Sequence, residues 1–477
     1  MTETAQSIEL EDGLPWPRRL WAVLTVVIAV SMSVLDSSIA NVALPTIAES
    51  LKASPASSVW VINAYQLALM IMLLPLASLG DIYGYKRINL CGLAVFTLAS
   101  LGCAASNSLI MLAAMRAVQG AGAAALMSVN AALIRSIYPH VMLGRGLGIN
   151  AFVVATSAAA GPTVAAGILD VATWPWLFLV NLPLGVIALA LAPRMLPPNR
   201  RSHHRFDGLS AALNALTFGL FITCIDGFGH GESFGLIAIQ FALMAAFGTA
   251  FAIRLKLSPF PMLPIDLFAR PIFALSVATS VCSFIAQSLA LVSLPFYFEH
   301  DLGLSQVTTG LLITPWPLAI AVVAPISGHY SDRYPAGILG GIGLGILSVG
   351  LVLLAFLPAY PGYADVAWRM TICGVGFGMF QSPNNRAILA STPRERSAGA
   401  GAIISTARLL GQTSGTALVA LVFGLAAAQP GPATGSETIA ILMGAGFSAV
   451  AALVSCLRLM NFDTPGKSGA GKPGGQT

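Results

Sequence analysis

The chain has 477 residues, of which 56% are hydrophobic and only 9% are charged, whereas soluble domains carry about 25% charged residues. This composition excludes an ordinary soluble domain. The net charge of +5 does not indicate nucleic-acid binding, because the basic residues are spread singly along the chain and not gathered in a stripe. The apolar stretches are long enough to cross a bilayer, which takes about 20 residues each. We therefore predict an all-α polytopic membrane protein.

The apolar stretches divide into fourteen predicted membrane-spanning helices. The first follows a polar start and is too long for the apolar core of a cleavable signal peptide, so we expect it to remain as a span. In chain order the predicted spans cover residues 20–44, 57–79, 88–107, 109–131, 146–168, 174–193, 208–229, 234–254, 272–296, 306–328, 337–358, 366–390, 398–427 and 437–459.

The distribution of basic residues predicts the orientation of these spans. If the N-terminus is cytoplasmic, nearly all of the 24 lysines and arginines fall in inner segments, and the outer segments hold only Lys52. Cytoplasmic loops are enriched in lysine and arginine. An odd number of spans would place many of these basic residues on the outer side. The pattern therefore favours an even count of spans and two cytoplasmic termini.

The chain repeats itself weakly, which predicts two related halves. Leu44-Pro45 ends the first span and Leu294-Pro295 ends the ninth, although chance recurrence of Leu-Pro is an alternative. Internal repeats with a site at their interface are typical of secondary transporters. The predicted parts are a cytoplasmic tail at 1–19, a six-helix bundle at 20–195, a linker with two extra spans at 196–271, a second six-helix bundle at 272–460 and a flexible cytoplasmic tail at 461–477.

Asp36 stands alone in an apolar helix, because the segment from residue 20 to Pro45 has no other charge. A carboxylate at that depth costs roughly 2.5–3.5 kcal/mol on insertion scales. Asp36 is therefore a candidate proton site, cation site or both. The alternative is a carboxylate held permanently in a structural pair.

The fourth predicted span carries a second charged motif, Arg116-Ala-Val-Gln119-Gly120-Ala-Gly122-Ala. Arg116 and Gln119 are three residues apart and share a helix face. Gly120 and Gly122 permit close approach of a neighbouring helix. Arg116 is a candidate partner of Asp36, and the alternative is an arginine that only caps nearby backbone carbonyls.

A short charged loop follows the second span of each half. Such a turn can hold the halves in one conformation through charge pairs and helix-end dipoles. The alternative is that the charged residues of these loops only fix the orientation of the spans in the membrane. The candidate gating residues are Asp81, Gly84, Lys86 and Arg87 in the first half and Asp332 and Arg333 in the second.

The fifth predicted span contains Gly161-Pro162. Proline removes an internal hydrogen bond and glycine lets a helix bend. We expect a kink there, with an ordinary structural kink as the alternative to a functional one.

Together these motifs resemble the major facilitator superfamily, and specifically its fourteen-span drug–proton antiporters, which export quaternary ammonium compounds, dyes and methyl viologen. The resemblance implies that Asp36 and Arg116 carry proton coupling, that the charged loops gate the halves, and that Gly161-Pro162 belongs to the antiporter motif. Ala165 and Ala166 stand where glycines are usual, and Tyr85 replaces an arginine of the loop motif. These departures weaken the inferences on transport direction and on the loop.

A polyspecific cavity needs apolar and aromatic walls with few polar anchors. Each candidate residue has simple packing as its alternative. The candidates are Trp60, Asn63, Tyr65, Asn150, Gln287 and Trp316.

We therefore expect a proton-coupled multidrug efflux transporter in a bacterial inner membrane, acting by alternating access on lipophilic, often cationic compounds. The expected partners are small-molecule drugs or lipophilic cations, protons and the lipid bilayer, with no nucleic acid, and the chain is expected to be a monomer. No cofactor or metal site is predicted, and no Walker-type loop indicates ATP-driven transport. The alternatives are a dedicated exporter of one metabolite or siderophore, a proton symporter, and a non-transporting membrane receptor or enzyme.

Overall fold

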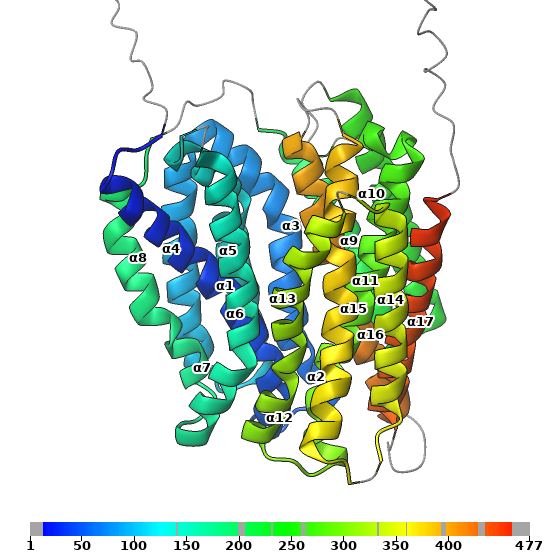
Figure 1. Cartoon of the computed structure of the whole chain (residues 1–477). Helices are drawn as coiled ribbons and strands as arrows, with labels where there is room; N and C mark the ends of the chain where they lie inside the picture. The colour runs from blue at the N-terminus through cyan, green and yellow to red at the C-terminus, as the bar shows by residue number, and fades with distance from the viewer. Residues whose placement is uncertain are drawn as a thin grey trace, which may run out of the picture.

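The computed structural model describes residues 13–139, 142–198, 206–229, 232–258, 263, 265–331, 333–358, 360–392, 397–427 and 435–459. Every regular element in these ranges is a helix, and the helices run side by side (Figure 1). The backbone groups of a helix bond within the helix, which is what a span in lipid requires. The prediction of an all-α membrane fold is therefore confirmed.

The N-terminal part forms one bundle in which α3 and α4 pack on α5 and α1 packs on α6 and α8. Polar side chains cap some of the helix starts: Ser54 accepts a hydrogen bond from the Ser57 amide and Ser108 from the Met111 amide. The helices are α1 (Arg18–Ser50), α2 (Pro55–Ser58), α3 (Trp60–Tyr83), α4 (Tyr85–Ala104), α5 (Leu109–Ile137), α6 (Leu143–Val171), α7 (Trp176–Leu179) and α8 (Asn181–Met195).

The C-terminal part packs its helices in the same pattern, with α13 and α14 on α15 and with α11 on α16 and α17. The elements are η2 (Ile265–Ala269), α11 (Pro271–Phe296), η3 (Tyr297–Asp301), α12 (Gln306–Ile313), α13 (Pro315–Tyr330), α14 (Ala336–Ala355), α15 (Tyr363–Ala390), α16 (Ser397–Ala427) and α17 (Ser436–Leu457).

One close helix contact occurs at matching places in the two bundles. In α5, a Cβ on Gly120 would lie 2.3 Å from the carbonyl oxygen of Tyr65 in α3. In α15, a Cβ on Gly374 would lie 2.3 Å from the carbonyl oxygen of Trp316 in α13. Only glycine allows the two backbones to approach this closely.

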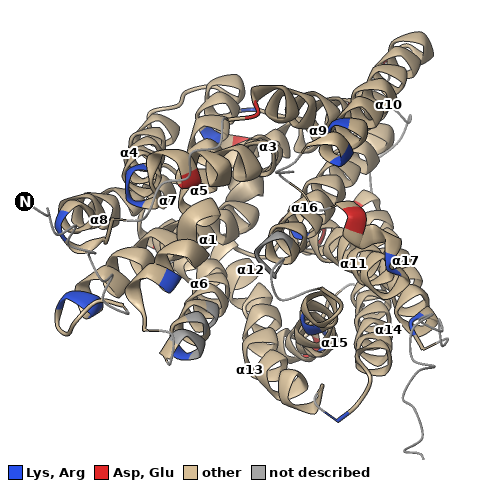
Figure 2. Cartoon of the chain, turned by 90° about the horizontal axis from the view of Figure 1, so that it is seen from above, with Lys and Arg blue, Asp and Glu red and all other residues tan. Residues whose placement is uncertain are grey.

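Two further helices, α9 (Gly208–Gly229) and α10 (Phe234–Leu257), lie beside the bundles when the molecule is viewed along its helices (Figure 2). Helix α9 packs against α3 of the first bundle and α16 of the second. The Asn214 amide donates to the Ile71 carbonyl at 3.0 Å, and the Trp60 Nε1 donates to Asp226 Oδ1 at 3.0 Å. The inserted pair is therefore attached to the N-terminal bundle at two heights along α3.

Within the described ranges, thirteen helices are long and apolar enough to cross a membrane. Helix α15 corresponds to the predicted span 366–390 and is 28 residues long, but it is not one of the thirteen. It carries Gln381, Asn384 and Asn385 in its second half, which lower its hydropathy. The count of fourteen spans and the cytoplasmic termini therefore stay predictions.

The topology can be tested with reporter fusions. A reporter fused after Arg396 is expected to read cytoplasmic, and one inserted near Glu49 or Asp301 is expected to read external, because cytoplasmic loops are enriched in lysine and arginine. Helix α1 begins and α17 ends at the same end of the molecule (Figure 1), so reporters at both ends should agree. An external reading at Arg396 would contradict the fourteen-span topology.

Candidate functional site

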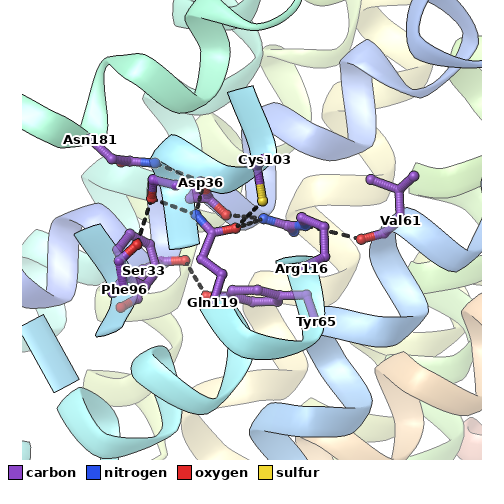
Figure 3. A network of polar contacts seen from close by, with 10 residues as sticks. Ser33, Asp36, Val61, Tyr65, Phe96, Cys103, Arg116, Gln119 and Asn181 are labelled. Carbon is purple, nitrogen blue, oxygen red and sulfur yellow. Dashed lines mark hydrogen bonds and ion pairs between the residues drawn. The ribbon is translucent and has the colours of Figure 1, made fainter. Parts of the chain in front are cut away.

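Asp36 lies at the centre of a buried polar network in the N-terminal bundle (Figure 3). Its Oδ2 forms an ion pair with Arg116 Nη1, and its Oδ1 accepts from Gln119 Nε2 and Asn181 Nδ2, both at 2.8 Å. Asp36 is 2% exposed, and the other three residues are fully buried. The structure thus brings the two residues predicted for proton coupling into direct contact.

Arg116 is held by further contacts around its guanidinium group. Its Nη1 also donates to Gln119 Oε1 at 2.7 Å, and its Nε donates to the Val61 carbonyl at 3.0 Å. The guanidinium carbon lies 4.3 Å from the centre of the Tyr65 ring and 5.6 Å from that of Phe178. Arginine over an aromatic face gains cation–π stabilisation, most strongly where water is excluded.

The network joins five helices of one bundle, because Arg116 also bonds to Val61 of α3. Asp36 comes from α1, Arg116 and Gln119 from one face of α5, and Asn181 from the first turn of α8. Gln119 Nε2 continues the network by donating to Ser100 Oγ of α4 at 2.9 Å. A change at Asp36 therefore acts on contacts between these helices.

The charge balance of this network determines what a proton on Asp36 would change. An ionised carboxylate accepts all three donors around it, whereas a protonated one becomes a donor and loses its attraction for the arginine. Removing one member of a buried ion pair leaves an uncompensated charge, at a cost of about 3–5 kcal/mol. Proton uptake at Asp36 must therefore be matched by movement of Arg116 or by a new partner.

Sequence reasoning identified part of this network and missed the rest. Gln119 was expected only to share a face with Arg116, and Tyr65 was expected to line a cavity. Asn181 and Ser100 were not predicted as members. Asn181 follows the short helix α7, and its neutral amide gives no signal comparable to an intramembrane charge.

The first gating loop has a local structure. Tyr85 donates its hydroxyl to Asp81 Oδ1 at 2.7 Å, and Lys86 Nζ donates to the Pro193 carbonyl at 2.6 Å. Gly84 has φ of 106°, a backbone conformation that glycine adopts without strain. Arg87 is exposed in the first turn of α4. The loop thus ties α3 and α4 to α8 within one bundle.

The second loop can be described only in part. Asp332 lies outside the described residues, and Arg333 is exposed. Nearby, Arg386 Nη1 of α15 donates to Ser331 Oγ at 3.0 Å. The gating role of both loops stays a prediction.

Replacing Asp81 by asparagine tests the gating role. We expect slower transport with substrate binding retained, because the change alters the balance of conformations and not the cavity. Tyr85→Phe is the matched control, since it removes the hydrogen bond but keeps the Asp81 charge. Lost binding in correctly inserted Asp81→Asn would contradict gating, and equal effects of both variants would assign the role to the hydrogen bond.

Gly161 and Pro162 lie inside α6 at a contact between the bundles. A Cβ on Gly161 would lie 2.2 Å from Ser38 Oγ of α1, and the Pro162 carbonyl oxygen would lie 2.6 Å from a Cβ on Gly310 of α12. Thr163 and Thr314 share a hydrogen bond at 2.9 Å. Gly161 therefore permits close packing of α6 on α1 within the N-terminal bundle, and Pro162 lies where α6 meets α12 of the C-terminal bundle.

The predicted cavity residues have different surroundings in the structure. Trp60 bonds to Asp226 of α9, as described above, and Asn150 accepts from Asn130 at 3.0 Å. Gln287 is partly buried. Asn63 and Trp316 are fully buried, and within the described ranges both the Asn63 amide and the Trp316 Nε1 have no hydrogen-bond partner.

A cavity of about 620 Å³ lies elsewhere, between the inserted pair and α16. None of the six predicted residues lines it. Its wall is mostly apolar, with one charged group, and is formed by Thr217, Phe218, Phe221, Met244, Ala245, Gly248, Thr249, Ala252, Ile253, Lys256 and Leu410.

The fold resembles solved transporter structures. A bacterial homologue of the human lysosomal transporter Spinster, crystallised in an inward-facing and unoccupied conformation, superposes with a TM-score of 0.69 at 15% identity. The likeness covers 93% of this chain and 98% of that one, and at this identity it shows the fold alone.

Relatives identify the family. The chain is 56% identical over 450 residues to the uncharacterized transporter YebQ of Escherichia coli K12, covering 94% of this chain and 97% of that protein. It is 30% identical over 410 residues (85% and 89%) to the riboflavin transporter RibZ of Clostridioides difficile, and 31% identical over 398 residues (82% and 73%) to the multidrug resistance protein Stp of Mycobacterium tuberculosis. The model of the Major Facilitator Superfamily matches residues 26–416. The chain is therefore a multi-pass membrane transporter of the major facilitator superfamily.

Proposed function

We propose that this chain is a proton-coupled efflux transporter of a bacterial inner membrane that expels lipophilic compounds. The observation that carries the proposal is the Asp36–Arg116 pair, a titratable carboxylate buried in the N-terminal bundle with a cation as its partner. A group of this kind in a membrane marks a proton or ion pathway more often than a structural need.

The coupling follows from the geometry of the network. In the deprotonated state Asp36 binds Arg116, Gln119 and Asn181 and holds α1, α5 and α8 together. Proton uptake weakens that connection, so one proton is exchanged for substrate as the bundles rock about their interface. The gradient of protons drives the cycle without a cofactor.

Export of several drugs is supported by Stp, named as a multidrug resistance protein. The resemblance to drug–proton antiporters adds the expectation that substrates are often cationic. A dedicated exporter of one metabolite is the second candidate. RibZ, which is named as a riboflavin transporter at similar identity, supports the single metabolite as cargo.

The proposal is tested in an efflux-deficient bacterial host and in inverted membrane vesicles. Expression of this chain should raise resistance to several chemically unlike lipophilic drugs, and an imposed pH gradient should drive their uptake into the vesicles. Resistance to a single compound would favour the dedicated exporter. Transport that persists after the proton gradient is collapsed would overturn the coupling.

A further inference from the structure

Arg408 of α16 is a second arginine deep in the molecule, and the Asp36 network does not include it. It lies in the middle of a 31-residue helix and is partly buried. Its Nε is shielded from solvent, and its guanidinium group makes no hydrogen bond or ion pair with any described residue. A cation at this depth is costly and is expected to have a partner.

Three other arginines among the described residues have side-chain partners. Arg116 pairs with Asp36, and Arg369 pairs with Asp365, with 3.0 Å between Nη2 and Oδ2. Arg458 donates to Asn384 Oδ1 at 2.7 Å, to Ser276 Oγ at 3.1 Å and to Ser455 Oγ at 2.9 Å. Arg408 differs from these three because none of its donors has a hydrogen-bond partner among the described residues, whereas in Arg458 only Nε lacks one.

The position of Arg408 is at the interface between the bundles. Helix α16 packs against α3, and Thr416 Oγ1 of α16 donates to Gln66 Oε1 of α3 at 3.2 Å. Arg408 is close enough to Tyr65 of α3 for the two groups to interact electrostatically. The Tyr65 ring also faces Arg116, so Tyr65 is near both the arginine that is paired with Asp36 and Arg408.

A second free polar group shares the face of α16. Gln412 is one turn along the helix from Arg408, is partly buried, and makes no side-chain hydrogen bond to a described residue. Residues four apart on a helix are neighbours. Together the two side chains offer a planar cationic fork and an amide, which suit the two oxygens of a carboxylate.

We propose that Arg408 and Gln412 form a binding site for the acidic group of the substrate, so that this transporter carries lipophilic compounds with a carboxylate or a similar oxyanion. The proposal rests on the proposed function, because the acid is the cargo. Asp36 already has three donors, so it is not free to pair with a cationic substrate. Arg408 has no hydrogen-bond or ion-pair partner among the described residues, so it can pair with the acidic group of a substrate even where the rest of the compound is cationic.

The test compares an acid with its own ester. Rhodamine B carries a carboxylate, and its ethyl ester keeps the same cationic ring system without it. A second pair, 2-naphthoate and methyl 2-naphthoate, has no cation. Binding is measured with the purified full chain in lipid nanodiscs, by dye polarisation for the first pair and by its displacement for the second.

We expect the wild type to bind each acid more tightly than its ester, and Arg408→Gln to lower affinity for the acids by about ten- to hundredfold while leaving the esters nearly unchanged. Arg408→Lys keeps the charge but loses the fork, so it should retain an intermediate preference. If Arg408→Gln fails to fold, the comparison of Arg408→Lys with the wild type decides the test. Arg458→Gln is the matched control and should not change the ratio of acid to ester affinity.

Equal binding of acids and esters by the wild type, tighter binding of the cationic ester, or no binding of any of the four compounds would overturn the proposal. So would an acid preference that survives in Arg408→Gln. These outcomes are separate from failure of the proposed function, which is read from proton-driven uptake in vesicles. Acid preference without proton-driven transport would keep this site and reject the coupling.

Discussion

Replacing Asp36 with asparagine is expected to abolish proton-driven efflux while the protein still reaches the membrane. The substitution removes the group that can titrate and keeps the size of the side chain. In inverted vesicles, a pH jump should no longer drive substrate uptake. Equilibrium binding of a neutral substrate should persist and should lose most of its dependence on pH.

The structure adds a stability effect to this expectation. Asparagine at position 36 leaves the Arg116 charge buried without its counter-ion, at a cost of about 3–5 kcal/mol. The double variant Asp36→Asn/Arg116→Gln removes both charges and should recover much of that loss, since the two sites are in contact and their effects are not additive. Thermal unfolding in detergent measures the recovery.

The double variant separates coupling from folding. If Asp36 carries the proton, the double variant should be stable, should bind substrate and should still fail to respond to a pH gradient. Full proton-coupled transport by either correctly folded variant would make Asp36 a structural residue. The family and the fold would stand, and the mechanism would be wrong.

The fold was predictable from the sequence because lipid imposes a simple rule. A span needs about 20 apolar residues, and each predicted span corresponds to a helix or to a pair of helices in direct succession. The breaks inside spans were not predictable. The span 174–193 divides into α7 and α8 just before Asn181, and 306–328 divides at Thr314 before Pro315. Hydropathy averages over such breaks, whereas the local backbone is set by packing.

The site was predictable only where it carries charge. Asp36 and Arg116 stand out because a charge in lipid is costly, and the structure pairs them. Asn181 and Ser100 are neutral and gave no signal before the helices were placed in space. Arg408 was visible as a charge, but the absence of a partner for it among the described residues depends on the three-dimensional neighbourhood.

The predicted cavity residues show the limit of this reasoning. From the sequence, cavity residues can be predicted only by residue type, such as an aromatic or amide side chain in a span. Whether such a side chain lines a cavity depends on which neighbours pack against it. Trp60 is joined to Asp226 of the inserted pair, and Tyr65 packs on Arg116. Asn63 and Trp316 keep unsatisfied buried polar atoms within the described ranges, which is costly and leaves them as the better substrate-contact predictions.

Gly120→Ala is expected to have a second large effect, on stability and transport together. The new Cβ would lie 2.3 Å from the Tyr65 carbonyl oxygen, so α5 must move away from α3. Overpacking of this kind costs about 1–3 kcal/mol, occasionally more. Arg116 lies one turn from Gly120 on α5, so the same movement disturbs its contacts with Tyr65 and Asp36.

Two further glycine variants show whether the effect comes from close packing or from the network. Gly345→Ala in α14 has nothing within 4 Å of the new Cβ and should raise stability by up to about 1 kcal/mol, since alanine favours helix over glycine. Gly374→Ala makes the same 2.3 Å contact with the Trp316 carbonyl in the other bundle. It should lower thermal stability about as much as Gly120→Ala but disturb the pH dependence of transport less. Equal loss of pH dependence in both variants would show that coupling depends on the rigidity of the whole fold and not on the position of Arg116.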